Sequence, residues 1–259
     1  MLESVKGLVI RSCDIGESDR LITIFTHEMG NITALVRGAR SLKNRNMSST
    51  QQFCYSSFVL MKRGDKYLVK ESALIESFFN LRSSIEGLSL AGYIVEVLSY
   101  VTTETPENDL LRLALNSLYA ISENKYSLEK IKGAFEIRAL SIIGYMPNLL
   151  GCRECEEKSG DFFFDIMSGD IQCFSCHEKA VAKRRDEEGE IPSARIVRIL
   201  SEGARIAMCY CIYSPVERVF AFNLKDEDMH LFSGAAEDYL VNQLERSFKS
   251  LEFYNEVKS

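Results

Sequence analysis

The first 80 residues show the alternation of apolar and polar side chains that is typical of short β-strands. Turn residues at positions 14–16, 29–31 and 64–65 divide this stretch. Between them lie segments rich in β-branched and aromatic residues, which we predict to be strands over residues 5–13, 20–26, 32–36, 53–63 and 67–72. Five short strands in a row predict a small closed barrel, either an OB-fold or an SH3-like barrel, because the two would look alike at this level.

The rest of the chain has apolar residues three and four positions apart, which indicates helices. The segment 88–103 is apolar almost all round and is therefore expected to be a buried helix. Further helices are predicted over residues 107–122 and 128–142, then from Pro192-Ser193 through 207, and over 226–248. A charged stretch over 183–190 is expected to be a solvated loop.

Two C-x2-C pairs interrupt the helical part. Their spacing is C-x2-C-x17-C-x2-C, and the residues between them read as a hairpin that turns at Ser168-Gly169. Four thiolates complete the tetrahedral shell of a zinc ion, so this pattern predicts one structural zinc and leaves no open position for a substrate. Free thiols, disulfides or a redox pair are the alternatives. The predicted ligands are Cys152, Cys155, Cys173 and Cys176.

These patterns together predict an α+β multidomain chain. An N-terminal OB-fold barrel is expected over residues 1–80. A helical domain is expected over 81–150 and 181–259, with a zinc ribbon inserted over 151–180. The four other cysteines are expected to fill small spaces in the core, namely Cys13, Cys54, Cys209 and Cys211.

Composition places the chain among soluble globular proteins. It has 259 residues, of which 46% are hydrophobic and 26% charged. No segment reaches the ~18 uninterrupted apolar residues of a membrane span. The N-terminus lacks the basic and apolar regions of a signal peptide, so a reducing cytoplasm is expected and no membrane partner.

Charge is unevenly distributed along the chain. The net charge is −6, yet residues 34–72 carry eight basic and two acidic side chains, a local +6 that leaves −12 for the rest. A basic surface on a barrel indicates binding of nucleic-acid phosphates, although a solvated surface or an anionic protein would also fit. The candidate DNA-binding residues are Arg20, Arg37, Arg40, Lys43, Arg45, Lys62, Arg63 and Lys66. Aromatic rings in the strands can stack on bases, but core packing is the simpler expectation for most of them.

Catalytic motifs are absent from the sequence. The three histidines are far apart, and we find no G-x-S-x-G, Walker A or H-E-x-x-H pattern. His177 follows Cys176 directly and is expected to be an exposed neighbour of the metal site. We therefore expect no enzyme and no small-molecule substrate.

Several short segments, in order, give the chain a specific family resemblance. They are GESDR at 16–20, RGAR at 37–40, LIESF at 74–78, GYMPNL at 144–149 and KSLEF at 249–253. The chain resembles the RecO family of bacterial recombination mediator and DNA repair proteins over nearly its whole length. Zinc cysteines are not universal in that family, and here all four are present.

The resemblance implies an OB-fold, a helical domain and a zinc ribbon, without enzymatic turnover. It implies binding of single- and double-stranded DNA and annealing of complementary strands in the cytoplasm, near the nucleoid. It also implies work with RecR and with the C-terminal tail of the single-stranded DNA-binding protein SSB, so that RecA can load. The family's basic loop matches Arg37, Arg40, Lys43 and Arg45.

Two other functions remain open from the sequence. The strongly acidic remainder of the chain would suit a protein-interaction adaptor whose DNA contact depends on partners. A zinc enzyme would rest on the metal site alone.

Overall fold

The computed structural model describes residues 2–41, 43–64, 66–188 and 196–258, without the side chains of 184–188. The chain forms two compact units. Unit 1 comprises residues 1–125 together with 248–259, and unit 2 comprises residues 126–247. The sequence predicts three domains, over residues 1–80, over 81–150 with 181–259, and over 151–180. This division stays a prediction, because the two units are defined by contacts within the chain and do not test those boundaries.

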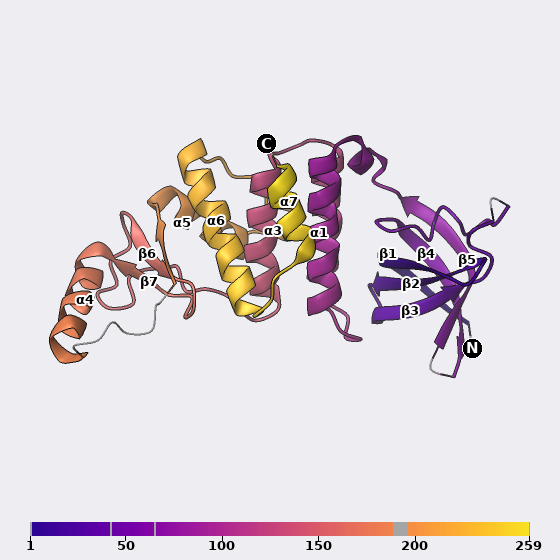
Figure 1. Ribbon diagram of the computed structural model, residues 1–259, viewed down its shortest axis with the longest axis horizontal. Coiled ribbons are helices and arrows are strands. Elements are labelled where there is room, and N and C mark those ends of the chain that lie inside the picture. The colour runs from indigo at the N-terminus through magenta and orange to yellow at the C-terminus, as the bar shows by residue number, and fades with distance from the viewer. Residues whose placement is uncertain (1, 42, 65, 189–195, 259) are drawn as a thin grey trace. The chain divides into compact units, whose positions relative to one another are not determined.

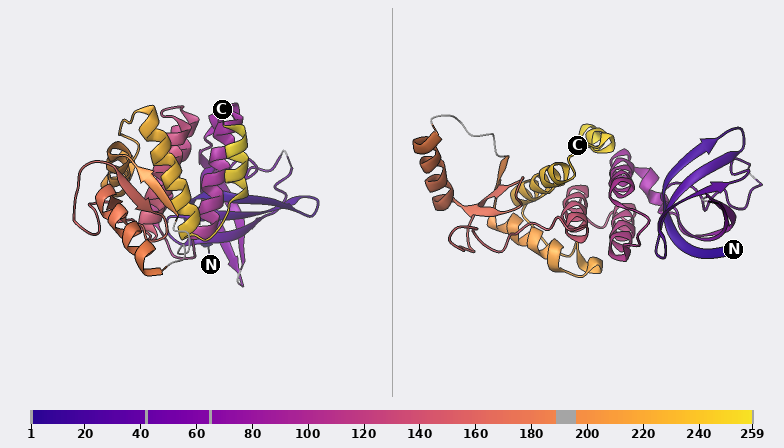
Figure 2. Two further views of the ribbon diagram at one scale, coloured as in Figure 1. Left: turned by 60° about the vertical axis from the view of Figure 1, so that its left-hand side comes forward. Right: turned by 90° about the horizontal axis from the view of Figure 1, so that it is seen from below.

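Unit 1 begins with a closed five-stranded barrel, as predicted. Its strands are β1 (Leu2–Ile15), β2 (Asp19–Thr26), β3 (Gly30–Val36), β4 (Tyr55–Arg63) and β5 (Lys66–Glu76). Their order around the barrel is β1-β2-β3-β5-β4, which closes because β1 also pairs with β4. All neighbours are antiparallel except β3 and β5, which pair in parallel with Ala34 beside Tyr67. Figure 2 shows the strands curving into this barrel. The order of the strands is that of an OB-fold.

The barrel interior is filled by the inward-facing residues of alternating positions, as the period of two requires. Val9, Ile24, Ala34, Phe58 and Leu60 are almost completely buried there. The residues at the intervening positions point outward from the barrel, where a ligand can reach them.

The described residues of unit 1 also form three helices and a short 3-10 turn at Phe79–Ser83. They are α1 (Ile85–Val101), α2 (Asn108–Ser122) and α7 (Lys249–Val257). The Ser84 hydroxyl caps α1 by accepting the Gly87 N–H. Helix α7 packs along α1, as Figures 1 and 2 both show.

Unit 2 contains a helical layer and a small sheet. The helices are α3 (Leu128–Ile142), α5 (Glu202–Tyr213) and α6 (Asp226–Gln243), which pack against one another, with a 3-10 turn at Val216–Arg218. Gly133 lets α3 approach α6 closely, because a Cβ there would lie 2.6 Å from Cε1 of Phe232.

A buried ion cluster joins the same two helices. The Lys132 ammonium is 2% exposed and lies 3.1 Å from Glu136 Oε2 and 2.8 Å from Glu237 Oε2. Burial alone would lower the pKa of Lys132, but the two carboxylates outweigh burial and raise the pKa.

The sheet of unit 2 contains the predicted hairpin and one further strand. Strands β6 (Phe162–Asp165) and β7 (Ile171–Cys173) form the hairpin, and β8 (Val197–Leu200) pairs with the other edge of β6. Helix α4 (Phe174–Glu188) follows β7 directly and packs against the hairpin strands (Figure 1).

Four sequence predictions are corrected here. Residues 197–200 form a strand and not the start of a helix, because they pair with Phe162–Asp165. The helix predicted over 226–248 ends at Gln243, and a separate helix begins at Lys249. Residues 183–188 continue α4 instead of forming a loop, while Pro192 and Ser193 lie outside the described residues. Cys13 is exposed and fills no core, whereas Cys54 and Cys211 are buried as expected.

Candidate metal centre and nucleic-acid interface

The four predicted metal ligands come together in unit 2. Cys152 and Cys155 lie in the connection between α3 and β6, Cys173 ends β7, and Cys176 lies in the first turn of α4. Their sulfur atoms all lie within 4.8 Å of one another. The Sγ atoms of Cys155 and Cys173 are 3.6 Å apart, far longer than the ~2.05 Å of a disulfide. A tetrahedron with metal–sulfur bonds of about 2.3 Å has edges of about 3.8 Å, so the spacing fits a metal site.

Backbone hydrogen bonds shape the turn that carries the first cysteine pair. The Glu156 N–H donates to the Cys152 carbonyl at 2.9 Å, and the Cys152 N–H donates to the Glu157 carbonyl at 2.7 Å. The Cys173 N–H donates to the Cys152 sulfur at 3.4 Å. This last contact links the two cysteine-bearing segments.

The thiols of the cluster are not equivalent. Burial raises the pKa of Cys152, but N–H groups of Cys173, Glu154 and Cys155 outweigh it and lower the pKa to about 6. Hydrogen bonds with the neighbouring thiols of Cys155 and Cys173 raise the pKa of Cys176 to about 12. A thiolate is the metal ligand, so binding a cation displaces protons from this cluster.

A buried arginine that the sequence pattern does not point to supports the cysteine turn. The Arg205 side chain, on α5, is 8% exposed and donates to the Leu149 carbonyl at 3.1 Å and the Lys158 carbonyl at 2.7 Å. Its guanidinium also lies 5.3 Å from the centre of the Phe162 ring. One side chain thus holds both ends of the segment that contains Cys152 and Cys155.

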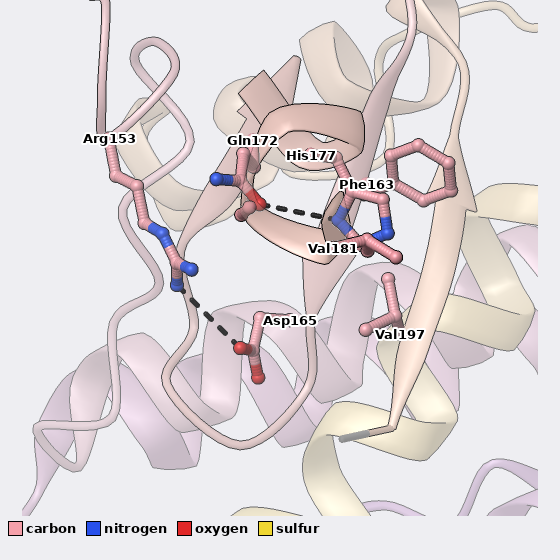
Figure 3. A pocket seen from close by; sticks show the side chains of 8 residues that line it. Arg153, Phe163, Asp165, Gln172, His177, Val181 and Val197 are labelled. Atoms are coloured by element: carbon pink, nitrogen blue, oxygen red, sulfur yellow. Dashed lines mark hydrogen bonds and ion pairs between the residues drawn. The ribbon is translucent and has the colours of Figure 1, made fainter. Parts of the chain in front are cut away.

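His177 follows Cys176 in the sequence, but its ring contacts Phe163 and Gln172. Its ring stacks on Phe163 with 4.0 Å between the ring centres, and its Nδ1 lies 3.2 Å from Oε1 of Gln172 (Figure 3). The side chain is half-buried, more than the sequence suggested. Together these residues line a pocket of about 220 Å³, across which Arg153 and Asp165 form an ion pair of 3.6 Å.

The predicted DNA-binding residues fall into two groups on the barrel. Arg37, Arg40, Lys43 and Arg45 are all exposed in the connection between β3 and β4. Lys62, Arg63 and Lys66 are exposed at the turn between β4 and β5. Because β3 and β5 run parallel, the two groups lie beyond opposite ends of the β3–β5 pairing.

Asparagine side chains give the first group a fixed scaffold. Asn44 Nδ2 donates to the Arg37 carbonyl at 2.8 Å, and Asn44 Oδ1 accepts the Asn46 N–H at 2.8 Å. Asn46 Oδ1 in turn accepts the Ser72 N–H from β5 at 3.0 Å. The basic segment is therefore attached to the barrel at both ends, and we call residues 37–46 the basic loop.

Arg20 is less available than the sequence suggested. Its side chain is 16% exposed, and its Nε lies 2.9 Å from Oδ1 of Asp14. Five aromatic residues of the predicted strands could stack on bases, namely Phe25, Phe53, Tyr55, Phe58 and Tyr67. Phe25, Phe53 and Phe58 are buried in the core, which is the simpler of the two expectations. Tyr55 and Tyr67 are half-buried.

Tyr67 lies in an open pocket of about 550 Å³ near the second basic group. Lys62 Nζ lies 5.7 Å from the centre of the Tyr67 ring, and Asn31, Thr33 and Glu104 also line the pocket. A cation next to an aromatic ring on an OB-type barrel suits contact with a nucleotide.

The barrel and the cysteine cluster define an OB-type protein with a four-cysteine ribbon that could hold a metal ion and with an exposed basic surface. Two family models match the chain: "Recombination protein O N terminal" over residues 1–78, and "Recombination protein O C terminal" over residues 82–252. The chain belongs to this family of DNA repair proteins, which confirms the resemblance carried by its sequence segments.

Curated relatives support the same assignment. The chain is 34% identical over 249 residues to the DNA repair protein RecO of Acetivibrio thermocellus, covering 95% of this chain and 94% of the relative. It is 35% identical over 179 residues to the protein of the same name from Alkaliphilus metalliredigens, covering 68% and 73%. The Clostridium acetobutylicum RecO is 27% identical over 256 residues, covering 98% and 97%. Among the described residues, no helix has both the length and the apolar character needed to cross a membrane.

Proposed function

We propose that this chain is a recombination mediator that binds single- and double-stranded DNA through its barrel and anneals complementary strands. The observation that carries the proposal is the basic loop, an exposed run of Arg37, Arg40, Lys43 and Arg45 fixed to an OB-type barrel in a chain of this family. Lys and Arg that neutralise phosphates release counterions, which favours binding without a sequence preference. Two strands neutralised on one surface repel each other less, so annealing follows from the same charges.

Partners and cofactor belong to the same proposal. By family analogy, the chain acts with RecR and contacts the SSB tail, so that RecA loads on SSB-coated DNA in the cytoplasm, close to the nucleoid. It acts as a mediator without catalytic turnover. One Zn²⁺ held by Cys152, Cys155, Cys173 and Cys176 stabilises the ribbon, because a closed four-thiolate shell contributes folding free energy and not chemistry.

The test is DNA affinity measured across a salt series. A variant with Arg37, Arg40, Lys43 and Arg45 all changed to Glu should bind a labelled single-stranded oligonucleotide far more weakly in fluorescence anisotropy. Losing four phosphate contacts should also flatten the slope of log K against log salt by about 3.

A control variant separates this local effect from net charge. It reverses four exposed basic residues of unit 2, Lys158, Lys179, Arg218 and Lys225. Both variants shift the net charge from −6 to −14, but only the first removes the basic loop. Equal affinity of the loop variant and the wild type would reject the loop as the interface. Binding that appears only after RecR or SSB is added would instead favour a protein-interaction adaptor. The acidic remainder of the chain would also fit that function.

A further inference from the structure

Two segments that carry the family resemblance meet at one corner of the barrel. The Arg40 N–H donates to the Ser18 carbonyl at 3.1 Å, and Arg40 Nη1 donates to the Glu17 carbonyl at 3.2 Å. The Gly38 N–H donates to Oδ1 of Asp19 at 2.8 Å. The start of the basic loop is therefore bound to the β1–β2 turn, which brings Arg40 next to Arg20.

One carboxylate lies between these two arginines. Asp14 Oδ1 is 2.9 Å from Arg20 Nε, and Asp14 Oδ2 is 3.7 Å from Arg40 Nε. Each carboxylate oxygen thus faces a different guanidinium, and the three groups together carry a charge of +1. Asp14 and Arg20 are also direct cross-strand partners in β1 and β2, so their backbones are fixed opposite each other.

The two arginines differ in freedom. The Arg20 side chain is 16% exposed, while those of Arg40 and Asp14 are 50% and 46% exposed. Arg20 is therefore held in the barrel wall, whereas about half of each of the other two side chains is open to solvent. An ion pair this exposed contributes little to stability, so an incoming anion can replace the carboxylate at small cost.

We propose that Arg20 and Arg40 form a binding site for one DNA phosphodiester, which Asp14 occupies while no DNA is bound. Guanidinium groups bind carboxylate and phosphate oxygens with the same planar donor geometry, so the two anions compete for the same place. Asp14 therefore limits the affinity for DNA. This site rests on the proposed DNA binding and adds a residue of opposite charge to the interface.

The test is Asp14→Asn, which removes the competing charge and keeps the shape of the side chain. Affinity for a labelled single-stranded oligonucleotide at low salt should rise, by up to about five-fold, which corresponds to about 1 kcal/mol. The slope of log K against log salt should also become steeper, because the arginines neutralise phosphate more fully.

Asp109→Asn is the matched control. Asp109 is 58% exposed and lies 3.6 Å from Arg112 on α2, so the variant makes the same change in net charge at another exposed ion pair of unit 1. Its affinity should stay close to that of the wild type, because charges remote from the bound strand are screened by salt. Thermal unfolding of both variants checks that they are folded.

A third variant, Arg40→Met, tests whether Asp14 acts through Arg40. It should reduce affinity more in the Asp14→Asn background than in the wild type. Equal reductions would overturn the site, as would a weaker affinity of Asp14→Asn, since the carboxylate would then be needed to hold the arginines in place. If Asp14→Asn and Asp109→Asn bind DNA with equal affinity, the phosphate site is rejected and the proposed function stands. If the wild type binds no DNA, the proposed function is rejected as well.

Discussion

The buried ion cluster between α3 and α6 gives a stability prediction that can be worked from distances. At an effective dielectric constant of about 20, charges separated by 2.8 and 3.1 Å attract by about 5–6 kcal/mol each. Burial of each ion costs several kcal/mol, which offsets most of this attraction. Changing Lys132 to Met removes the attraction but leaves the Glu136 carboxylate, which is 0% exposed, without its cation. We expect the free energy of unfolding to fall by about 3–5 kcal/mol.

The assay is urea unfolding followed by circular dichroism, because the chain contains no tryptophan. Hydrogen exchange of α3 and α6 should show where protection is lost. The double variant Lys132→Met with Glu136→Gln should recover part of the loss, since the buried charge is then removed as well. Arg112→Met, which removes the cation of an exposed pair, should cost less than about 1 kcal/mol.

The outcome at pH 7 decides whether the buried ion cluster is responsible for the loss. A loss below about 1 kcal/mol at pH 7, or no recovery in the double variant, would refute this account of the cluster.

Three other predictions follow from single contacts. Metal analysis should find one zinc per wild-type chain and none in Cys173→Ser, whose ribbon sheet should also lose its hydrogen-exchange protection; a folded, zinc-loaded variant would contradict the metal site. Gly133→Ala should lower the melting temperature because its Cβ would meet Phe232, while Gly92→Ala on α1, where space is open, should raise it. Burial, together with the nearby carboxylate of Asp170, raises the pKa of Tyr239 to about 12. Stability should therefore fall as pH rises above about 10, and Tyr239→Phe should show a shallower fall in denaturant titrations; parallel pH profiles would argue against it.

Much of the fold was predictable because local pattern and tertiary structure agree. All five barrel strands and the hairpin between the cysteine pairs were predicted, since alternation and turn residues mark them directly. The four cysteines were predictable as one cluster because ligand spacing is local in sequence. In contrast, Val197–Leu200 reads as part of a helix, and only its pairing with β6 makes it a strand.

The candidate DNA interface was predictable only in part. The positions of its basic residues follow from the charge pattern, but their partners do not. Asp14 lies six residues from Arg20 and 26 from Arg40 in the sequence, and it joins them because the β1–β2 hairpin and the end of β3 meet in space. Asn44 and Asn46 are likewise ordinary loop residues in the sequence. Their role appears only when their hydrogen bonds to Arg37 and Ser72 are seen.

The second segment of unit 1 has a consequence for how the protein is made. Phe248 packs edge-on against Tyr93 and Tyr100 of α1, and the Ser250 N–H donates to a Glu96 carboxylate oxygen at 3.0 Å. On the ribosome, residues 126–247 are synthesised before α7 exists, so α1 emerges with its packing face uncovered. Domains fold as units during synthesis, so unit 2 can fold first, and unit 1 closes only when α7 arrives.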